Sequence, residues 1–173
     1  RLVGSEMVIR DSFTPVTPGN FDFEEYKAYE QSLLPGCEAF WKSEKGGVLV
    51  YRRMRVKDVF AQDACDMQKS LYWQLGALEK SMLFKADIPN FLEPWYGIGT
   101  IASAFGFDYI WEPGQAPAVD GKFNSIRQLV EKEAIQVKDT RIGKCTLDMI
   151  HYFLDKTKGL LPLSYCDIQS PLN

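Results

Sequence analysis

The chain contains a single histidine in 173 residues and has no closely spaced pair of cysteines. Its four cysteines are far apart, so we expect neither a zinc ribbon nor a disulfide framework; they are Cys37, Cys65, Cys145 and Cys166. Any Ser–His or Cys–His catalysis within the chain would require His151, which falls in the middle of an expected helix. The cysteine usage favours a reducing, cytoplasmic setting.

Long apolar runs and an excess of basic residues are also missing. No run approaches the roughly 20 apolar residues that cross a membrane, and no signal peptide is visible. Lys and Arg number 20 against 23 Asp and Glu, which gives a net charge of −3. Since nucleic-acid binding needs a basic face, we expect neither nucleic acid nor a membrane as a partner.

The composition is that of an ordinary globular domain, with 46% hydrophobic and 25% charged residues. Such a chain can bury a substantial core. It begins with Arg1, and it ends with "LPLSYCDIQSPLN", an apolar strand that runs into a polar loop. We therefore expect this sequence to be the front part of a larger protein.

The first third of the chain predicts helices followed by a strand. Asp22 is a suitable N-cap for a helix that Pro35 would end, and a second short helix is expected after it. The stretch "GGVLVYRRM" then has the β-branched and aromatic content of a strand. We therefore divide the chain into an N-terminal extension with helices, 1–45, and a region of βα units, 46–173.

A long helix is predicted from about residue 63 to residue 85. Apolar residues recur there at intervals of four, four, three and four, which traces one helix face; they are Met67, Leu71, Leu75, Leu78 and Met82. Gly76 interrupts this helix and should cost about 1 kcal/mol relative to alanine.

Beyond this helix, strand-like and helical stretches alternate. "DIPNFLEPWYG", "FDYIWEPG" and "GLLPLSYC" are typical of short strands, and the last has the continuous apolar character of a buried parallel strand. We expect one helix that ends at Gly106, a second that begins after Ser125 and continues to Gln136, and a third from Thr146 to Gly159. The alternation favours a mostly parallel sheet. The pattern alone leaves open a doubly wound sheet and a (β/α)8 barrel.

Two stretches resemble the uroporphyrinogen-decarboxylase-like superfamily. "FLEPWYGIGTIASAFG" has its strand, Pro-aromatic-Gly turn and following helix, and "TLDMIHYFLDKTKGLLPLSYCDIQSPLN" has its helix, Pro-led strand and Asp-x-Gln-small-Pro-Leu loop. The resemblance covers roughly residues 60–173. It implies an incomplete (β/α)8 TIM barrel, of which this chain would be the N-terminal portion with preceding helices.

The superfamily includes the tetrapyrrole decarboxylase of haem synthesis and methyltransferases that use a corrinoid. The decarboxylases carry an Arg-x-x-x-Arg motif after the first strand, whereas here Arg53 is followed four residues later by Lys57. Lysine lacks the planar fork that grips carboxylates. The resemblance therefore favours methyl transfer involving a corrinoid or a small methylated substrate. Tetrapyrrole decarboxylation and a non-catalytic binding or assembly module remain alternatives.

The candidate site residues follow the expected strands, because reactive groups of a parallel barrel cluster where its strands end. Asp167 is the candidate catalytic residue, since a carboxylate at an apolar mouth could bind a substrate nitrogen or handle a proton. The candidate substrate-binding residues are Glu93, Trp95, Tyr96, Glu112, Gln169 and Ser170. Each also has a structural alternative, such as capping a helix or satisfying its own loop.

The expected partners are a small-molecule or corrinoid-bound substrate, together with a second copy in a homodimer or the remaining part of the barrel. We expect no cofactor to be held within this chain alone, although the complete protein could hold zinc and a corrinoid. Gly97 and Gly99 lack the third glycine of a dinucleotide fingerprint. They instead predict a tight turn or a close approach of the backbone.

Overall fold

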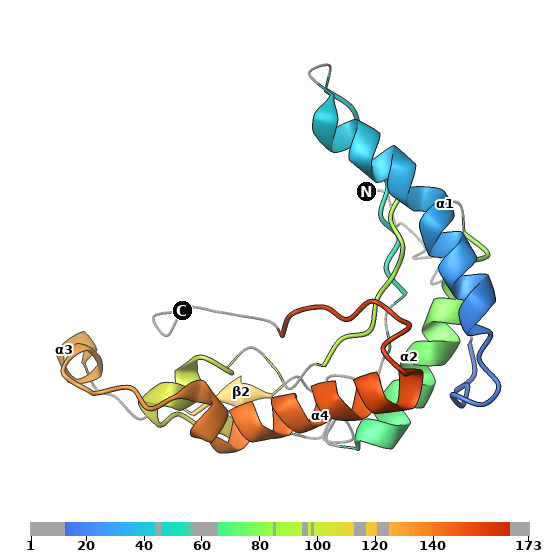
Figure 1. The fold of residues 1–173 in the computed structure, drawn as a ribbon. Coiled ribbons are helices and arrows are strands. Elements are labelled where there is room, and N and C mark those ends of the chain that lie inside the picture. Colours follow the sequence, from blue (N-terminus) through green and yellow to red (C-terminus); the bar gives the residue numbers. More distant parts are fainter. Residues whose placement is uncertain are drawn as a thin grey trace, which may run out of the picture.

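The structure is a computed structural model that describes residues 13–43, 46–54, 56, 66–84, 86–94, 97, 99–112, 117–120 and 125–166. Its elements are α1 (Phe23–Lys42), α2 (Met67–Ser81), η3 (Ala102–Phe105), β1 (Tyr109–Ile110), β2 (Ala118–Val119), α3 (Ile126–Val130), η4 (Val137–Asp139) and α4 (Arg141–Thr157). In Figure 1, α1 rises as an arm and α4 runs along the base. The lower end of α1 and the C-terminal end of α4 meet near α2.

The prediction of an incomplete (β/α)8 TIM barrel is wrong. In the described part of the chain, the regular sheet consists of β1 and β2, which pair antiparallel with Tyr109 opposite Val119. The fold is mixed and mostly helical. Three apolar stretches that predicted strands are extended, but in two of them, 46–54 and 86–94, several main-chain groups bond to side chains instead of to a neighbouring strand. Such bonds satisfy the backbone without building a regular sheet.

One extended segment, 86–94, is paired with the chain that follows α4. Leu92 forms an isolated parallel bridge with Leu163. The Leu92 N–H donates to the carbonyl of Pro162 at 2.9 Å, and the Ser164 N–H donates to the Leu92 carbonyl at 2.9 Å. Segment 86–94 and the segment after α4 therefore run parallel at this bridge.

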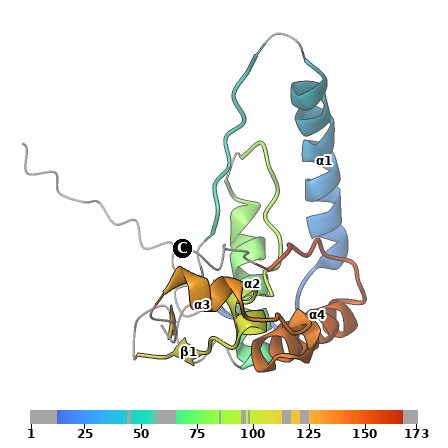
Figure 2. The ribbon, with the colours of Figure 1, turned by 90° about the vertical axis from the view of Figure 1, so that its left-hand side faces the viewer.

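The other side of segment 86–94 holds segment 46–54. The Asp87 N–H donates to the Val50 carbonyl at 2.8 Å, and the Val50 N–H donates to the Asp87 carboxylate at 2.7 Å. Farther along, the Asn90 amide makes two more bonds to the main chain of segment 46–54, at 3.0 and 3.1 Å. Segment 86–94 thus lies in the middle, and in Figure 2 segment 46–54 (teal) is on its side away from α1.

Helix α1 begins where the sequence predicts and ends later. The Asp22 side chain accepts from the Glu25 N–H at 2.9 Å, which confirms the N-cap. The helix continues through Pro35 to Lys42, so the predicted break is wrong. The carbonyl of Gln31, which a proline at position 35 deprives of its donor, belongs to an exposed residue and can bond to water. No helix among the described residues, α1 included, is long and apolar enough to cross a bilayer.

Helix α2 supplies the centre of the core. The predicted stripe is confirmed, because Leu71, Leu75 and Leu78 are all buried. They belong to one apolar cluster with residues of α1 and α4, including Tyr26 and Phe153. Burying a leucine or phenylalanine contributes about 1.5–3 kcal/mol, so this cluster is what joins the three long helices.

Helix α4 begins six residues earlier than expected, at Thr140 instead of Thr146. The Thr140 hydroxyl accepts from the Gly143 N–H at 2.9 Å and donates to the Val137 carbonyl at 2.8 Å. A Cβ on Gly143 would lie 1.8 Å from that carbonyl, so glycine allows η4 to pack tightly under the helix start. Thr146 lies within the helix and donates to the Ile142 carbonyl.

Two shorter helices differ from expectation in length. Gly106 ends η3 in the left-handed conformation at φ 83°, as predicted. Ser125 accepts from the Gln128 N–H at 3.4 Å, which confirms it as a cap. However, α3 ends at Val130 instead of continuing to Gln136. The described side chains from 125 to 136 are exposed, and a helix without a packed face is marginal in water.

The two glycines before η3 lie beneath the small sheet. A Cβ on Gly99 would come within 2.6 Å of the Tyr109 ring and 2.8 Å of Val119. Gly97 has φ +91°, and a Cβ there would lie 3.0 Å from the Tyr109 hydroxyl. The predicted close approach of the backbone is therefore confirmed, and its cause is packing against β1 and β2.

Two glycines in helices should respond oppositely to alanine. At Gly76 a Cβ would lie 1.9 Å from the Thr14 carbonyl oxygen, whereas at Gly36 nothing lies within 4 Å. We expect Gly76→Ala to lower the free energy of unfolding by about 1–3 kcal/mol or more, and Gly36→Ala to raise it by about 0.5–1 kcal/mol. Urea denaturation of both variants tests this, and equal effects would contradict the close approach at Gly76.

Tyr26 should make the fold sensitive to alkali. It is fully buried, its hydroxyl donates to the Asn90 carbonyl at 2.6 Å, and burial raises its pKa. Above about pH 10 the unfolded chain loses this proton while the folded chain keeps it. The unfolding free energy should then fall by up to about 1.4 kcal/mol per pH unit from this residue.

The matched variant is Tyr26→Phe, which removes the hydroxyl. At neutral pH it should destabilise the fold by about 1–3 kcal/mol, because the Asn90 carbonyl loses its donor. Its unfolding free energy should fall less steeply above pH 10 than that of the wild type. Parallel slopes in denaturation curves measured from pH 8 to 11 would show that Tyr26 is not the titrating group.

Candidate functional site

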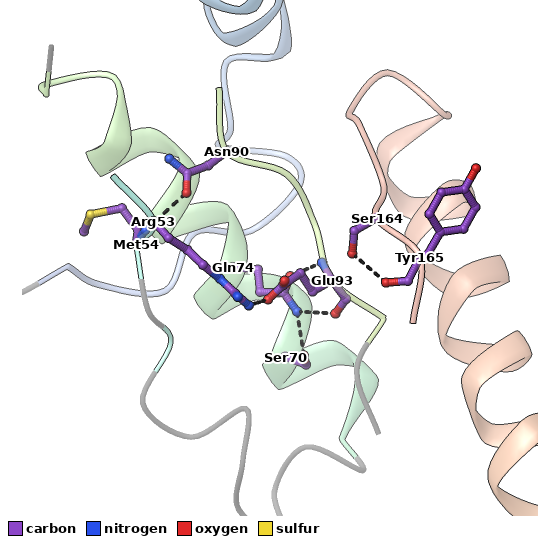
Figure 3. Close-up of polar contacts among 8 residues, drawn as sticks. All are labelled: Arg53, Met54, Ser70, Gln74, Asn90, Glu93, Ser164 and Tyr165. Carbon is purple, nitrogen blue, oxygen red and sulfur yellow. Dashed lines mark hydrogen bonds and ion pairs between the residues drawn. The ribbon is translucent and has the colours of Figure 1, made fainter. Parts of the chain in front are cut away.

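The main chain of Glu93 is held by one buried side chain of α2. The Gln74 amide oxygen accepts from the Glu93 N–H at 2.7 Å, and its amide nitrogen donates to the Glu93 carbonyl at 3.0 Å. The same nitrogen donates to the Ser70 hydroxyl at 3.0 Å. Gln74 is only 5% exposed. Figure 3 shows this arrangement, which fixes Glu93 against α2.

The Glu93 carboxylate points toward segment 46–54, where it forms an ion pair with Arg53 (Figure 3). The Glu93 side chain is 22% exposed and the Arg53 side chain 45% exposed, so the pair lies at the surface of the core. Arg53 binds the Oε2 atom, and Oε1 has no protein partner within the described ranges. That oxygen can accept a hydrogen bond from a substrate N–H or O–H group.

The segment after α4 runs beside Glu93. Because Leu92 and Leu163 form a parallel bridge, Glu93 and Ser164 are the next residues in the same direction on two adjacent segments. The Ser164 hydroxyl donates to the carbonyl of Tyr165 at 3.0 Å, and the Tyr165 side chain is 94% exposed. A ligand near Glu93 could therefore also meet Ser164.

The predicted site residues have three different outcomes. Glu93 lies in the polar network formed with Gln74 and Arg53. Glu112 is exposed, just after β1, and takes no part in that network. The other five lie outside the residues that the structure describes: Trp95, Tyr96, Asp167, Gln169 and Ser170. His151 is exposed in the middle of α4.

The neighbouring arginines do not converge on a common point. The Arg52 guanidinium lies over the Phe84 ring, 3.5 Å from its centroid, while Arg53 pairs with Glu93. This follows from the extended backbone, in which successive side chains point to opposite faces. Tyr51, on the Arg53 face, stacks with Phe91 at a centroid distance of 6.3 Å. Its pKa is raised by burial, an effect that the charge of Arg53 partly offsets.

Sequence reasoning missed the residues that organise the site. Gln74 lies on the same helix face as Leu71 and Leu78, and a polar residue on a buried stripe is a signal that it must find partners. Asn90 is 4% exposed and carries no such signal, because it lies in a loop-like stretch. Neither pattern indicates which distant main-chain groups these amides bind.

The described residues do not fit a zinc site. No group of three or more His, Cys, Asp or Glu side chains within the described ranges could hold a metal ion. A surface groove of about 490 Å³ is lined by residues such as Phe13, Thr14, Gly76 and Leu83, and no described site residue borders it. The implied zinc and corrinoid therefore have no identified binding residues in this part of the chain.

Compared with known proteins, the chain matches no family model, no curated protein and no solved structure. The resemblance to the uroporphyrinogen-decarboxylase-like superfamily therefore remains a prediction from the sequence. Functional assignment depends on the residues and contacts described above.

Replacing Gln74 should loosen the site. Gln74→Leu keeps the side-chain size but leaves the N–H and carbonyl of Glu93 without their partner, so we expect a loss of about 1–3 kcal/mol in unfolding free energy. The control is Gln68→Leu on the same helix, because the Gln68 side chain is exposed and donates to the Tyr72 hydroxyl. That change should stay within about 0.5 kcal/mol. Equal effects in thermal denaturation would refute the role of Gln74.

Proposed function

We propose that this chain takes part in methyl transfer, as a uroporphyrinogen-decarboxylase-like protein that acts on a small methylated or corrinoid-bound substrate. The observation that carries the proposal is the parallel bridge between Leu92 and Leu163. It joins the two stretches whose residues resemble that superfamily. Polar candidates from both stretches thus follow neighbouring segments, as a shared substrate site requires.

In this proposal Glu93 contacts and orients the substrate. Gln74 fixes its main chain and Arg53 takes one carboxylate oxygen, so the remaining oxygen has a defined position. A positioned acceptor can hold a substrate in a reactive orientation. Asp167 is proposed as the proton-handling residue, with Gln169 and Ser170 as further substrate contacts, on the strength of the resemblance alone. Trp95 and Tyr96 are proposed to line the site on the same basis.

Tetrapyrrole decarboxylation has less support. That reaction, as the resemblance describes it, uses paired arginines that bind substrate carboxylates. Here Arg52 stacks on Phe84 and Arg53 is engaged by Glu93, so the two do not form a common carboxylate clamp. We also propose a cytoplasmic setting, which is supported by the free thiols of Cys37 and Cys145.

Titration of the purified protein with hydroxocobalamin and methylcobalamin tests the proposal. We expect a change in the corrinoid absorption spectrum on binding, and methyl transfer from methylcobalamin to a small thiol. Glu93→Gln should reduce turnover by roughly 10–150-fold, since a hydrogen bond to a charged group contributes about 1.5–3 kcal/mol.

The control variant is Glu38→Gln, because Glu38 is an exposed carboxylate on α1 that pairs with Lys42. It should leave turnover unchanged. Release of carbon dioxide from uroporphyrinogen without methyl transfer would replace the proposal by the decarboxylase alternative. Binding of neither corrinoid nor methylated substrate would favour a non-catalytic module.

A further inference from the structure

Segment 46–54 has one edge that is paired and one that is open. The Val50 N–H and carbonyl and the Met54 N–H all bond toward segment 86–94. Main-chain groups alternate in direction along an extended segment, so those of the intervening residues point the opposite way. Within the described part of the chain, the main-chain groups of Leu49 and Tyr51 have no hydrogen-bond partner.

Apolar side chains flank this open edge. Val48 is 84% exposed and Val50 55% exposed, and Trp41, at the end of α1, is 80% exposed. The end of α1 adjoins the segment, because a Cβ on Gly47 would lie 3.3 Å from the Phe40 ring. Proteins normally protect an edge with charge, proline or a bulge. An unpaired edge with exposed valines can instead accept an additional β-strand, which would bond to its free main-chain groups.

The nearby charges do not protect the edge. Arg53 is engaged by Glu93, and the Arg52 guanidinium covers the Phe84 ring. Both side chains are thus directed onto the faces of their own molecule instead of along the edge. In Figure 2 the segment also lies on the side of 86–94 away from α1.

We propose that the open edge of segment 46–54 docks the same edge of a second copy of this chain, in antiparallel register about Tyr51. A two-fold axis at Tyr51 pairs Tyr51 with itself and Leu49 with Arg53 of the other copy. These are the residues whose main-chain groups point outward, so every pair can exchange two hydrogen bonds. A closed two-fold contact uses the same patch on both copies, as self-complementarity requires.

The side chains suit this register. Val50 falls opposite Arg52, and Leu49 opposite Arg53, so no like charges face each other within segment 48–54. Two tyrosines meet at the axis, and cross-strand aromatic pairs are stabilising. The competing occupant, an extended segment of a different protein, would not require this self-matching sequence. The inference does not depend on methyl transfer.

Sedimentation equilibrium of the purified chain provides the first test. We expect a concentration-dependent dimer, and we expect Val48→Lys combined with Val50→Lys to weaken association at least about tenfold, or about 1.4 kcal/mol. Both valines are exposed, so circular dichroism should be unchanged. The control is Leu83→Lys, at a residue 71% exposed after α2, which should leave association intact. A strictly monomeric wild type, or equal effects of the two changes, would overturn the proposal.

Cross-linking provides the second test and reports the register. Paired residues in this geometry have Cα atoms about 5.5 Å apart, within the range of about 4.4–6.8 Å that a disulfide spans. Tyr51→Cys should therefore give a covalent dimer with oxidised glutathione, beyond the level of wild type and of Leu83→Cys. A wild-type dimer whose Tyr51→Cys form does not cross-link would mean that the copies meet elsewhere, and the proposal would be wrong.

Discussion

Segment 86–94 crosses the core as extended chain, and its main-chain polar groups must find partners there, because an unpaired buried group costs several kcal/mol. The partners come from α1, α2, segment 46–54 and the segment after α4. Tyr26 of α1 bonds the Asn90 carbonyl, and Gln74 of α2 bonds both main-chain groups of Glu93. Leu92 pairs with the segment after α4. The packing of the helices is therefore tied to this one stretch.

The candidate site is a direct result of that constraint. Gln74 is on the buried face of α2 because it satisfies Glu93, and a side chain whose backbone is fixed on both sides presents its carboxylate in a defined place. Arg53 then balances the charge at the edge of the core. Successive side chains of an extended segment point to opposite faces. Arg53 therefore reaches Glu93 on one face, while Arg52 lies over the Phe84 ring on the other.

The three extended segments differ in how completely they are paired. Segment 86–94 has a neighbouring segment on each side, whereas segment 46–54 has a neighbouring segment on one side only within the described part of the chain. Much of the pairing uses side-chain amides and carboxylates of Asn90 and Asp87 in place of main-chain groups. This satisfies individual bonds without building a regular sheet, and the main-chain groups of Leu49 and Tyr51 have no partner in the described part of the chain. Val48 and Val50, beside that edge, are exposed apolar residues.

The sequence by itself determined the features whose causes lie within a few residues. These are the cap at Asp22, the apolar face of α2, the left-handed turn at Gly106 and the close approach of the backbone at Gly99. It also identified Glu93 as a polar residue at the end of an apolar stretch. Each of these signals depends on local spacing or on the conformational range of a single residue.

Only the tertiary structure decided the sheet, the start of α4 and the partners of Glu93. Thr140 and Thr146 are equally good caps in sequence, and the fit of Gly143 under the Val137 carbonyl selects the first. Tyr26 and Asn90 are 64 positions apart, and Gln74 is 19 from Glu93. Which buried donor meets which acceptor depends on how the helices pack, and no local pattern contains that information.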